Sequence, residues 1–190
     1  MEPLILASTS PYRGELLARL GYPFDSVAPE YEESRVPTLS ARELSLCHAR
    51  GKARSVAARC PGRIVIGSDQ VAELDGDTLG KPGGQAGAVS QLLRMAGRSV
   101  AFHTALAVVR DEREESALET YTVRLRDLSR EEIEEYVRAD RPFGCAGAFR
   151  IESRGIALME ELRGRDYTAL IGLPLIALTD LLRRFGVRVL

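Results

Sequence analysis

The sequence lacks the features of a secreted, membrane-spanning or zinc-binding protein. Its three cysteines, Cys47, Cys60 and Cys145, are odd in number and have none of the paired short spacings of a disulfide framework or a zinc site. No apolar run reaches the roughly 18 residues of a membrane span, and the first residues lack the basic and apolar regions of a signal peptide. These absences favour a cytoplasmic protein that contacts no membrane.

The chain also lacks an excess of charge of either sign. Its 26 basic and 27 acidic residues leave a formal net charge of −1. No global field would therefore attract a nucleic-acid polymer, and we expect none as a partner. The P-loop signature GxxxxGK[ST] and the dinucleotide signature GxGxxG are both absent. Any phosphate binding must therefore be local and built from other residues.

What is present predicts one α/β domain over residues 1–190. With 45% hydrophobic residues, a chain of 190 residues can bury a full core. Capping boxes at Ser40 with Glu43 and at Ser129 with Glu132 mark two helix starts. The predicted elements are strands over 4–7 and 64–66, an extended stretch over 71–74 before a turn at 75–76, half-exposed antiparallel strands over 99–109 and 118–125, helices over 11–20, 41–59, 85–95, 130–139 and 174–185, and an extended loop over 22–38. This mixture indicates a mixed, mostly antiparallel sheet with flanking helices.

A turn rich in hydroxyl groups lies between the first strand and the first helix, with the sequence Ser8-Thr9-Ser10-Pro11-Tyr12-Arg13. Ser10 is a candidate N-cap with Pro11 at the first helical position. Free backbone N–H groups, hydroxyl donors and a guanidinium at such a turn suit a phosphate group. The alternative is an ordinary helix cap followed by a surface arginine.

Asp69 comes just after the strand RIVIG, separated from it by Ser68, at a position where α/β proteins often place functional residues. Glu32 and Glu33 on the long loop are its candidate acidic partners. Carboxylates gathered around a triphosphate hold Mg²⁺ or Mn²⁺ through oxygen, and one can take a proton from water. The alternative for Asp69 is a turn or helix cap. Lys52 and Lys81 are candidate phosphate ligands, with a solvated helix face as the alternative for Lys52.

Taken together, the motifs resemble those of the Maf-like nucleotide pyrophosphatases. The motifs are LILASTSPYR, GSDQV, GKP, CAGAF and GLPL, and their order and spacing extend over nearly the whole chain. The resemblance implies a fold like that of inosine triphosphate pyrophosphatases, an elongated sheet with two lobes around a cleft, often in a homodimer. It also implies hydrolysis of a nucleoside triphosphate between its α and β phosphates.

Functional residues carry over from the family motifs position by position. Ser8 and Arg13 match the phosphate-binding turn, and Lys52 and Lys81 match the two lysines of the family. Asp69 matches the proposed proton acceptor, and Glu33 matches the acidic loop residue. The resemblance thus implies Asp69 as the catalytic base and Glu33 with Asp69 as ligands of the divalent metal.

Three further positions distinguish the substrate branches of the family, and here they are Tyr12, Gln70 and Glu152. An aromatic residue, Gln and Glu at these positions resemble the branch that acts on 7-methyl-GTP. An enzyme of this branch would remove modified nucleotides from the pool. The dTTP and UTP branch would show Arg, Thr and Gln instead. An aromatic ring can stack on the cationic methylated guanine, and a carboxylate can accept from its N–H groups. Alternatives are a pyrophosphatase for dTTP, UTP or modified pyrimidine nucleotides, and a nucleotide-binding regulator of cell division.

One segment departs from the family pattern. The family usually has Arg-Leu-Ala ahead of Lys52, whereas this chain has Cys47-His48-Ala49. Either Arg50 or Arg54 supplies the missing basic group, or the helix contributes less to phosphate binding. His48 and His103 have no ligand-spaced partners, so we expect both to be packed or at the surface.

Overall fold

A single seven-stranded sheet forms the frame of the protein in the computed structural model, which describes residues 2–34 and 36–189. The strand order is β2-β1-β3-β5-β6-β7, and β4 pairs with β3 off this path. The strands are β1 (Leu4–Leu6), β2 (Phe24–Ser26), β3 (Val65–Leu74), β4 (Asp77–Leu79), β5 (Ser99–Arg110), β6 (Arg113–Leu125) and β7 (Met159–Arg163). β1 runs parallel to β2 and β3, whereas the other described pairs are antiparallel. The predicted mixed, mostly antiparallel sheet is confirmed.

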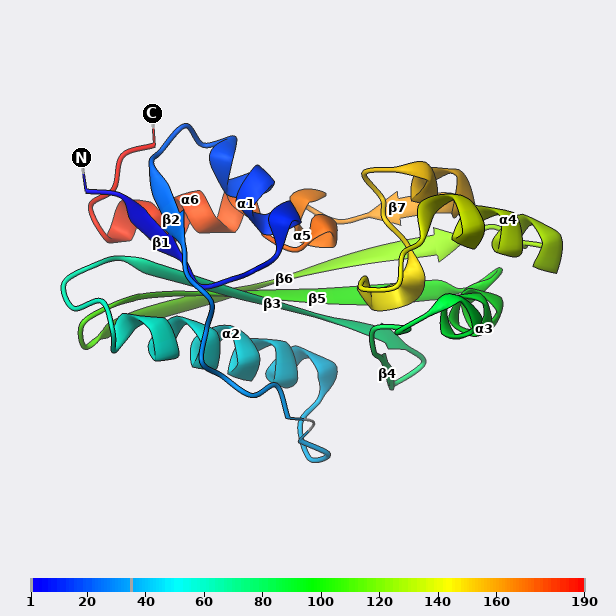
Figure 1. Cartoon of the computed structure of the whole chain (residues 1–190), viewed down its shortest axis with the longest axis horizontal. Coiled ribbons are helices and arrows are strands. Elements are labelled where there is room, and N and C mark those ends of the chain that lie inside the picture. The colour runs from blue at the N-terminus through cyan, green and yellow to red at the C-terminus, as the bar shows by residue number, and fades with distance from the viewer. Residues whose placement is uncertain (1, 35, 190) are drawn as a thin grey trace.

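One lobe places this sheet between two helical layers (Figure 1). Helix α2 (Ala41–Ala57) covers one face, while α1 (Pro11–Ala18), α5 (Thr168–Ile171) and α6 (Leu175–Arg184) lie on the other. Alternate residues of β1 serve the two layers, as the period of a strand requires. Leu4 and Leu6 join the cluster that includes α1 and α6, whereas Ile5 joins the α2 cluster.

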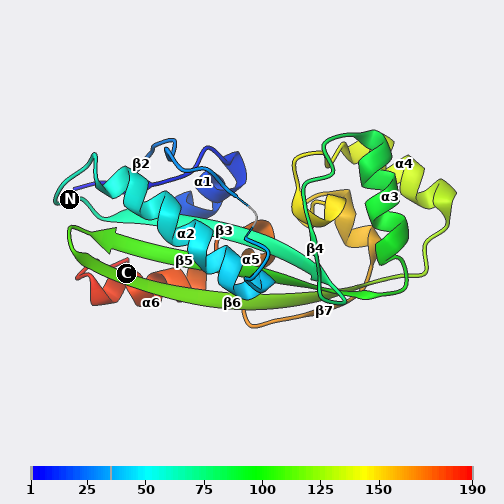
Figure 2. The same ribbon diagram turned by 90° about the horizontal axis from the view of Figure 1, so that it is seen from below.

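The second lobe gathers around the opposite ends of the long strands (Figure 2). It contains β4, α3 (Gln85–Met95), α4 (Arg130–Asp140), the short 3₁₀ helices Ala146–Ala148 and Arg154–Leu158, and β7. Phe102 of β5 and Leu92 of α3 are buried in its core. Strands β3, β5 and β6 contribute core residues to both lobes, so the elongated two-lobed arrangement is confirmed.

The predicted helix starts are confirmed. At Ser40 and Ser129 both hydrogen bonds of the capping box form, to Glu43 and Glu132 respectively. Ser10 is the N-cap of α1 with Pro11 behind it, but its side chain makes no capping bond. No helix among the described residues has the length and apolar character needed to cross a bilayer.

The loop predicted over 22–38 and the strand end predicted before Asp69 are both wrong in part. The loop contains β2, which pairs with β1 through three residues. β3 is continuous, because its residues Val65 to Glu73 pair with β5 without a break. Asp69 therefore lies inside a strand, opposite Ala105, and not beyond a strand end.

The half-exposed character predicted for 99–109 is also wrong, because helices cover both faces of β5 and nearly all of its side chains are buried. Its partner β6 begins at Arg113 instead of 118, so only Asp111 and Glu112 form the turn. Helix α5 was not predicted, since four residues are too few to display a helical period.

Candidate active site

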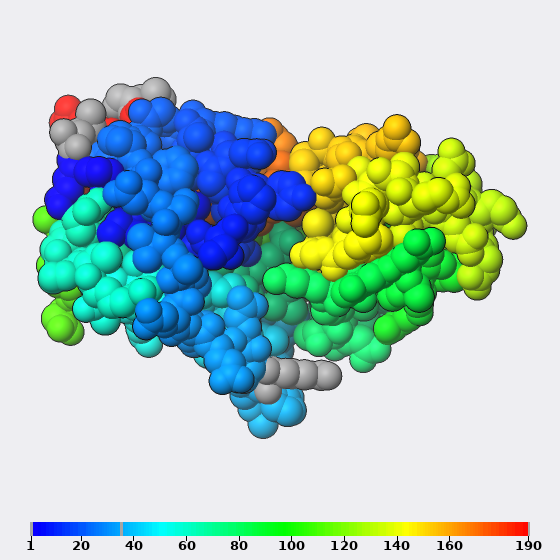
Figure 3. All heavy atoms as spheres, in the orientation of Figure 1, coloured from blue at the N-terminus to red at the C-terminus, as the bar shows by residue number. Residues whose placement is uncertain are grey.

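A pocket of about 330 Å³ lies between the two lobes. In Figure 3 the surface is hollowed where the dark blue N-terminal segment meets the yellow and green segments of the second lobe. Small-molecule sites commonly measure about 300 to 1,000 Å³, so the volume suits a nucleotide better than a polymer. The structure brings every predicted site residue to its wall, namely Ser8, Tyr12, Arg13, Glu33, Lys52, Asp69, Gln70, Lys81 and Glu152. Their individual roles stay predictions.

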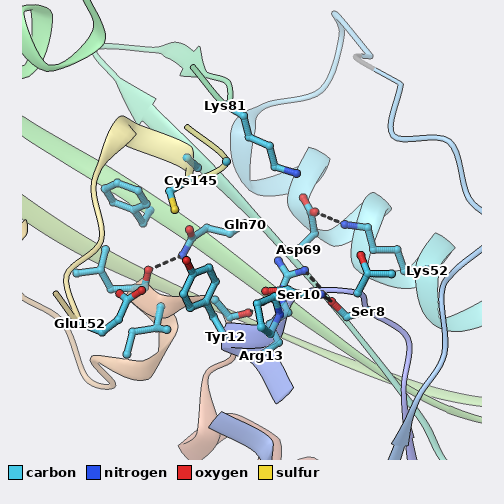
Figure 4. Close-up of a pocket in the computed structure, with 18 of the residues that line it drawn as sticks. Ser8, Ser10, Tyr12, Arg13, Lys52, Asp69, Gln70, Lys81, Cys145 and Glu152 are labelled. Atoms are coloured by element: carbon cyan, nitrogen blue, oxygen red, sulfur yellow. Dashed lines mark hydrogen bonds and ion pairs between the residues drawn. The ribbon is translucent and has the colours of Figure 1, made fainter. Parts of the chain in front are cut away.

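The hydroxyl-rich turn enters the pocket at the start of α1. Arg13 Nε donates to the carbonyl oxygen of Gly172 at 2.9 Å, and its Nη1 lies 3.5 Å from Ser8 Oγ. Ser8 Oγ also accepts from the backbone N–H of Ser10 at 3.1 Å. Burial lowers the pKa of Arg13, while the charges of Asp69 and Glu33 raise it in part. The guanidinium is thus a fixed cation at this end of the pocket, as Figure 4 shows.

Lys52 joins two of the three acidic residues of the site, Asp69 and Glu33. Its Nζ lies 2.6 Å from Asp69 Oδ1 and 2.7 Å from Glu33 Oε1. Lys52 and Asp69 are each only 5% exposed, so the alternative of a solvated lysine is wrong. Asp69 Oδ2 has no hydrogen-bond partner among the described residues, which leaves it available to a bound molecule.

The close approach of α2 to β3 explains why Lys52 reaches Asp69. Gly67 of β3 faces the helix, and a Cβ atom there would lie 2.3 Å from the carbonyl oxygen of Ala49. Only glycine permits the backbones to pack this closely. Helix α2 therefore lies close enough to β3 for the Lys52 side chain to reach Asp69, two residues after Gly67.

Tyr31 fixes the loop that carries Glu33. Its ring lies against Gly51 of α2, where a Cβ atom would be 2.1 Å from Tyr31 Cε2, and its hydroxyl is 3.0 Å from His48 Nδ1. Burial would raise the pKa of Glu33, but the hydrogen bond and charge of Lys52 outweigh it and lower the pKa below its ordinary value. Glu33 is therefore ionised at neutral pH and held at the mouth of the pocket.

The other acidic residues of this loop lie elsewhere. Glu30 pairs with Arg59, with 2.7 Å between Oε1 and Nη1, and Glu32 does not line the pocket. The described residues contain no group of three or more His, Cys, Asp or Glu side chains arranged to hold a metal. The two carboxylates of Glu33 and Asp69 nevertheless fit Mg²⁺ or Mn²⁺, because Mg²⁺ commonly takes one or two carboxylates and completes its shell with phosphate oxygens and water.

Gln70 presents a hydrogen-bond acceptor to the far end of the pocket. Its Nε2 donates to the carbonyl oxygens of Ala169 at 2.8 Å and Leu170 at 3.0 Å. The hydroxyl of Thr104 donates to the same Ala169 oxygen and lies 3.0 Å from Nε2. Carbonyl oxygens can only accept, so the NH₂ group must face α5 and the Oε1 atom is left for a ligand.

Tyr12 and Glu152 complete this end of the pocket from opposite lobes (Figure 4). Tyr12 lies at the start of α1, and the exposed Glu152 follows the 3₁₀ helix at Ala146–Ala148. Burial, with the charge of Glu152 adding, raises the pKa of the Cys145 thiol, which is neutral at physiological pH. The end of the pocket near Gln70 thus combines the Tyr12 ring and the neutral Cys145 thiol with two hydrogen-bond acceptors, Gln70 Oε1 and the Glu152 carboxylate.

Lys81 extends into the pocket from the connection between β4 and α3 (Figure 4). Gly83 N donates to Phe143 O at 3.1 Å, which ties this connection to the second lobe. Lys52 and Lys81 are the two lysines of the whole chain, all other basic residues being arginine. Both line the pocket, one from each lobe, where a compact ammonium group fits beside phosphate oxygens.

The departure from the family pattern on α2 lies outside the pocket. Cys47 is exposed, and His48 is buried against Tyr31. Arg50 and Arg54 both pair with Glu114 of β6, at 3.2 and 2.5 Å, and neither lines the pocket. Neither arginine therefore supplies a basic group to the site. His103 is likewise packed, with its Nδ1 2.9 Å from Thr120 Oγ1, as expected.

Sequence reasoning missed the residues that support the site through backbone atoms. The carbonyl oxygens of Ala169, Leu170 and Gly172 hold Gln70 and Arg13 in place. Every residue type has a backbone carbonyl oxygen, so no sequence motif could identify these three acceptors. The GLPL motif at 172–175 lies next to them but indicates only where α5 ends.

Three relatives named 7-methyl-GTP pyrophosphatase match the chain along almost its whole length. Those from Syntrophotalea carbinolica, Bordetella parapertussis and Xanthomonas oryzae pv. oryzae are each 50% identical to it, over 100%, 96% and 98% of this chain and 98%, 92% and 98% of theirs. Among solved structures, the Staphylococcus aureus Ham1 protein is 16% identical with a TM-score of 0.49, over 81% of this chain and 90% of its own. Protein VC0702 from Vibrio cholerae is 14% identical with a TM-score of 0.48, over 96% and 98%. The family model described as Maf-like protein matches residues 3–185, the span that contains the whole pocket, and the chain belongs to this family.

Proposed function

We propose that this protein hydrolyses 7-methyl-GTP to 7-methyl-GMP and diphosphate, and so removes a modified nucleotide from the pool. The observation that carries the proposal is the orientation of Gln70, whose fixed NH₂ group leaves only the Oε1 acceptor in the pocket. The names of the three relatives support the same substrate.

Acceptors at the base end of the pocket favour guanine. Guanine offers N1–H and N2–H donors on one edge, and Gln70 Oε1 and the Glu152 carboxylate both accept. Adenine has an acceptor at N1 and would face them with a lone pair. Methylation at N7 makes the ring cationic, which strengthens attraction to the Glu152 carboxylate and stacking on Tyr12. The methylated base therefore fits this end better than guanine itself.

At the other end, cations from both lobes surround the space for the phosphates. Arg13, Lys52 and Lys81 would stabilise the negative charge that develops on the phosphate oxygens. Lys52 orients Asp69 through Oδ1 and leaves Oδ2 to accept a proton from the attacking water. Water then adds to a phosphorus of the α–β linkage, the anhydride bond breaks, and diphosphate leaves. Bound Mg²⁺ or Mn²⁺, held by Glu33 and Asp69, would supply neutralisation of phosphate charge.

A substrate panel tests the proposal. Diphosphate release is measured with Mg²⁺ for 7-methyl-GTP, GTP, UTP, dTTP and CTP, and we expect the highest kcat/KM with 7-methyl-GTP. Equal values for GTP and 7-methyl-GTP would contradict the argument from the cationic base. Preference for UTP or dTTP would favour the pyrimidine alternative, and binding without turnover would favour a nucleotide-binding regulator of cell division.

Replacement of Asp69 by Asn tests the catalytic base. The change keeps the size of the side chain and removes its basicity, so we expect turnover to fall by about 10² to 10⁴-fold while the fold is retained. Asp127→Asn is the matched control, because Asp127 is exposed and lies outside the pocket. Full activity of Asp69→Asn would overturn the assignment.

We also propose that the protein acts in the cytoplasm as a homodimer, without nucleic-acid polymers as partners. The exposed side chains of Tyr167 and Ile176, 55% and 42% accessible, support a surface that a second copy could cover. The near-neutral charge argues against polyanion binding. Sedimentation equilibrium tests the dimer, and a concentration-independent monomer would contradict it.

A further inference from the structure

Arg150 connects the second lobe to a base-recognition residue of the first. Its Nη1 lies 3.3 Å from the hydroxyl oxygen of Tyr12 and donates to it. Tyr12 belongs to α1, whereas Arg150 follows the 3₁₀ helix Ala146–Ala148. The hydrogen bond thus joins the two lobes beside the base end of the pocket, which Tyr12 lines and Arg150 does not.

The guanidinium of Arg150 is itself held firmly. Its Nη2 lies 2.8 Å from Asp140 Oδ1 and 2.6 Å from the Asp140 carbonyl oxygen. Asp140 is 5% exposed, and it also accepts from Tyr136 at 2.9 Å and from Ser153 at 2.6 Å. A buried carboxylate with this many donors has one stable arrangement, so the direction of the Arg150 side chain is fixed.

The same short segment carries Glu152. The carbonyl oxygen of Arg150 accepts from Gly155 N at 3.0 Å, and a Cβ atom at Gly155 would lie 2.3 Å from that oxygen. Glu152 is therefore inside a tight turn whose first residue is Arg150. The turn is tied to α4 by Ser153 through Asp140. One network thus places both Glu152 and, through the guanidinium, the ring of Tyr12.

We propose that Arg150 is a positioning residue for base recognition, which sets the spacing between the Tyr12 ring and the Glu152 carboxylate. The inference rests on the proposed function, because it assumes that the base lies between these two groups. Without Arg150 the Tyr12 ring could rotate away from the base and would stack less well on it. The loss of binding energy would be larger for the cationic methylated base than for neutral guanine. Arg150 therefore contributes to the preference for the methylated base without touching the reacting phosphates.

Tyr12→Phe is the sharpest test, because it removes the hydroxyl that accepts from Arg150 and leaves the ring and the Asp140 network in place. We expect the ratio of kcat/KM for 7-methyl-GTP over GTP to fall roughly five- to tenfold, through KM and with kcat nearly unchanged. Tyr167→Phe is the matched control, since its hydroxyl accepts from Arg19 at 2.8 Å outside the pocket.

A second variant tests Arg150 directly. Arg150→Lys keeps a cation beside Asp140 but lacks the planar guanidinium whose two Nη atoms reach Tyr12 and Asp140 at once. We expect it to lower the ratio as Tyr12→Phe does, and the double variant to show no further loss, because both changes break one interaction. Additive losses would overturn the proposal, as would a Tyr12→Phe variant that matches Tyr167→Phe.

Binding of the products separates this inference from the proposed function. Calorimetry gives the Kd of 7-methyl-GMP and of GMP for the wild type and for Tyr12→Phe, without any need for turnover. A wild type with equal affinity for the two would overturn the proposed substrate and this inference together. A wild type that prefers 7-methyl-GMP, with an unchanged preference in Tyr12→Phe, would overturn the role of Arg150 alone.

Discussion

Replacing Gly51 by Ala should displace Glu33 while changing the free energy of unfolding only slightly. Gly51 lies inside α2, and the added Cβ atom would lie 2.1 Å from Tyr31 Cε2, far inside van der Waals contact. The ring must leave, and its hydrogen bond to His48 Nδ1 breaks with it. The loop that carries Glu33 then loses the contact of Tyr31 with the helix and keeps the ion pair of Glu33 itself with Lys52 of α2.

The effect on stability is small because two contributions oppose each other. Alanine in a helix interior stabilises by about 0.5 to 1 kcal/mol over glycine. Loss of the Tyr31 hydrogen bond costs about 1 kcal/mol, and loss of the packing of its half-buried ring a similar amount. We therefore expect the free energy of unfolding to fall by no more than about 1.5 kcal/mol. Side chains that orient a metal ligand typically affect metal affinity by about 10- to 100-fold.

The assay is the Mg²⁺ dependence of diphosphate release, measured together with urea unfolding. We expect the half-saturating Mg²⁺ concentration to rise at least tenfold in Gly51→Ala. Gly14→Ala is the control, because Gly14 lies in α1 and a Cβ atom there would meet nothing within 4 Å, so the change should only stabilise. A Gly51→Ala protein with an unchanged Mg²⁺ requirement would refute the role of Tyr31 in placing Glu33.

Two further predictions concern packing and pH. Gly67→Ala forces α2 away from β3, because its Cβ atom would lie 2.3 Å from the Ala49 carbonyl oxygen. We expect the free energy of unfolding, measured in urea, to fall by about 1 to 3 kcal/mol. An unchanged unfolding midpoint would contradict the close approach of α2 to β3. Burial would raise the pKa of the Asp140 carboxyl, but hydrogen bonds from Arg150, Ser153 and Tyr136 outweigh it and lower the pKa below its ordinary value. The stabilisation that Asp140 contributes is therefore present above about pH 4, where an ordinary aspartate is ionised, and is lost as the pH falls through the lowered pKa. Asp140→Asn should therefore be less stable than the wild type by at least about 2 kcal/mol at pH 7, with a gap that narrows below pH 4 in chemical unfolding; a gap independent of pH would refute this account.

The sequence predicts most of the elements because their signals are local. The capping boxes at Ser40 and Ser129 and the alternation of β1 each act within a few residues. The continuity of β3 through Asp69 was missed, because pairing with β5 is a long-range interaction that overrides the local turn propensity of Gly67-Ser68-Asp69.

The site follows the same division. The family motifs identified the side chains that line the pocket, since residue type records their chemistry. Burial of Lys52 could not be predicted, because it depends on how closely α2 approaches Gly67. The contact between Arg150 and Tyr12 joins residues 138 positions apart, and no spacing rule connects them.

The three long strands have a mechanical consequence for how the pocket admits a nucleotide. β3 pairs with β5 from Val65 to Glu73, and β5 pairs with β6 from Ser99 to Arg110, without interruption between the lobes. Such a sheet resists rotation about a pivot and deforms as a twisted plate, because any sharp bend would break ladder hydrogen bonds. The width of the pocket is therefore set by strand twist, and the connections over 27–34 and 80–84 border it through Pro29, Glu33 and Lys81.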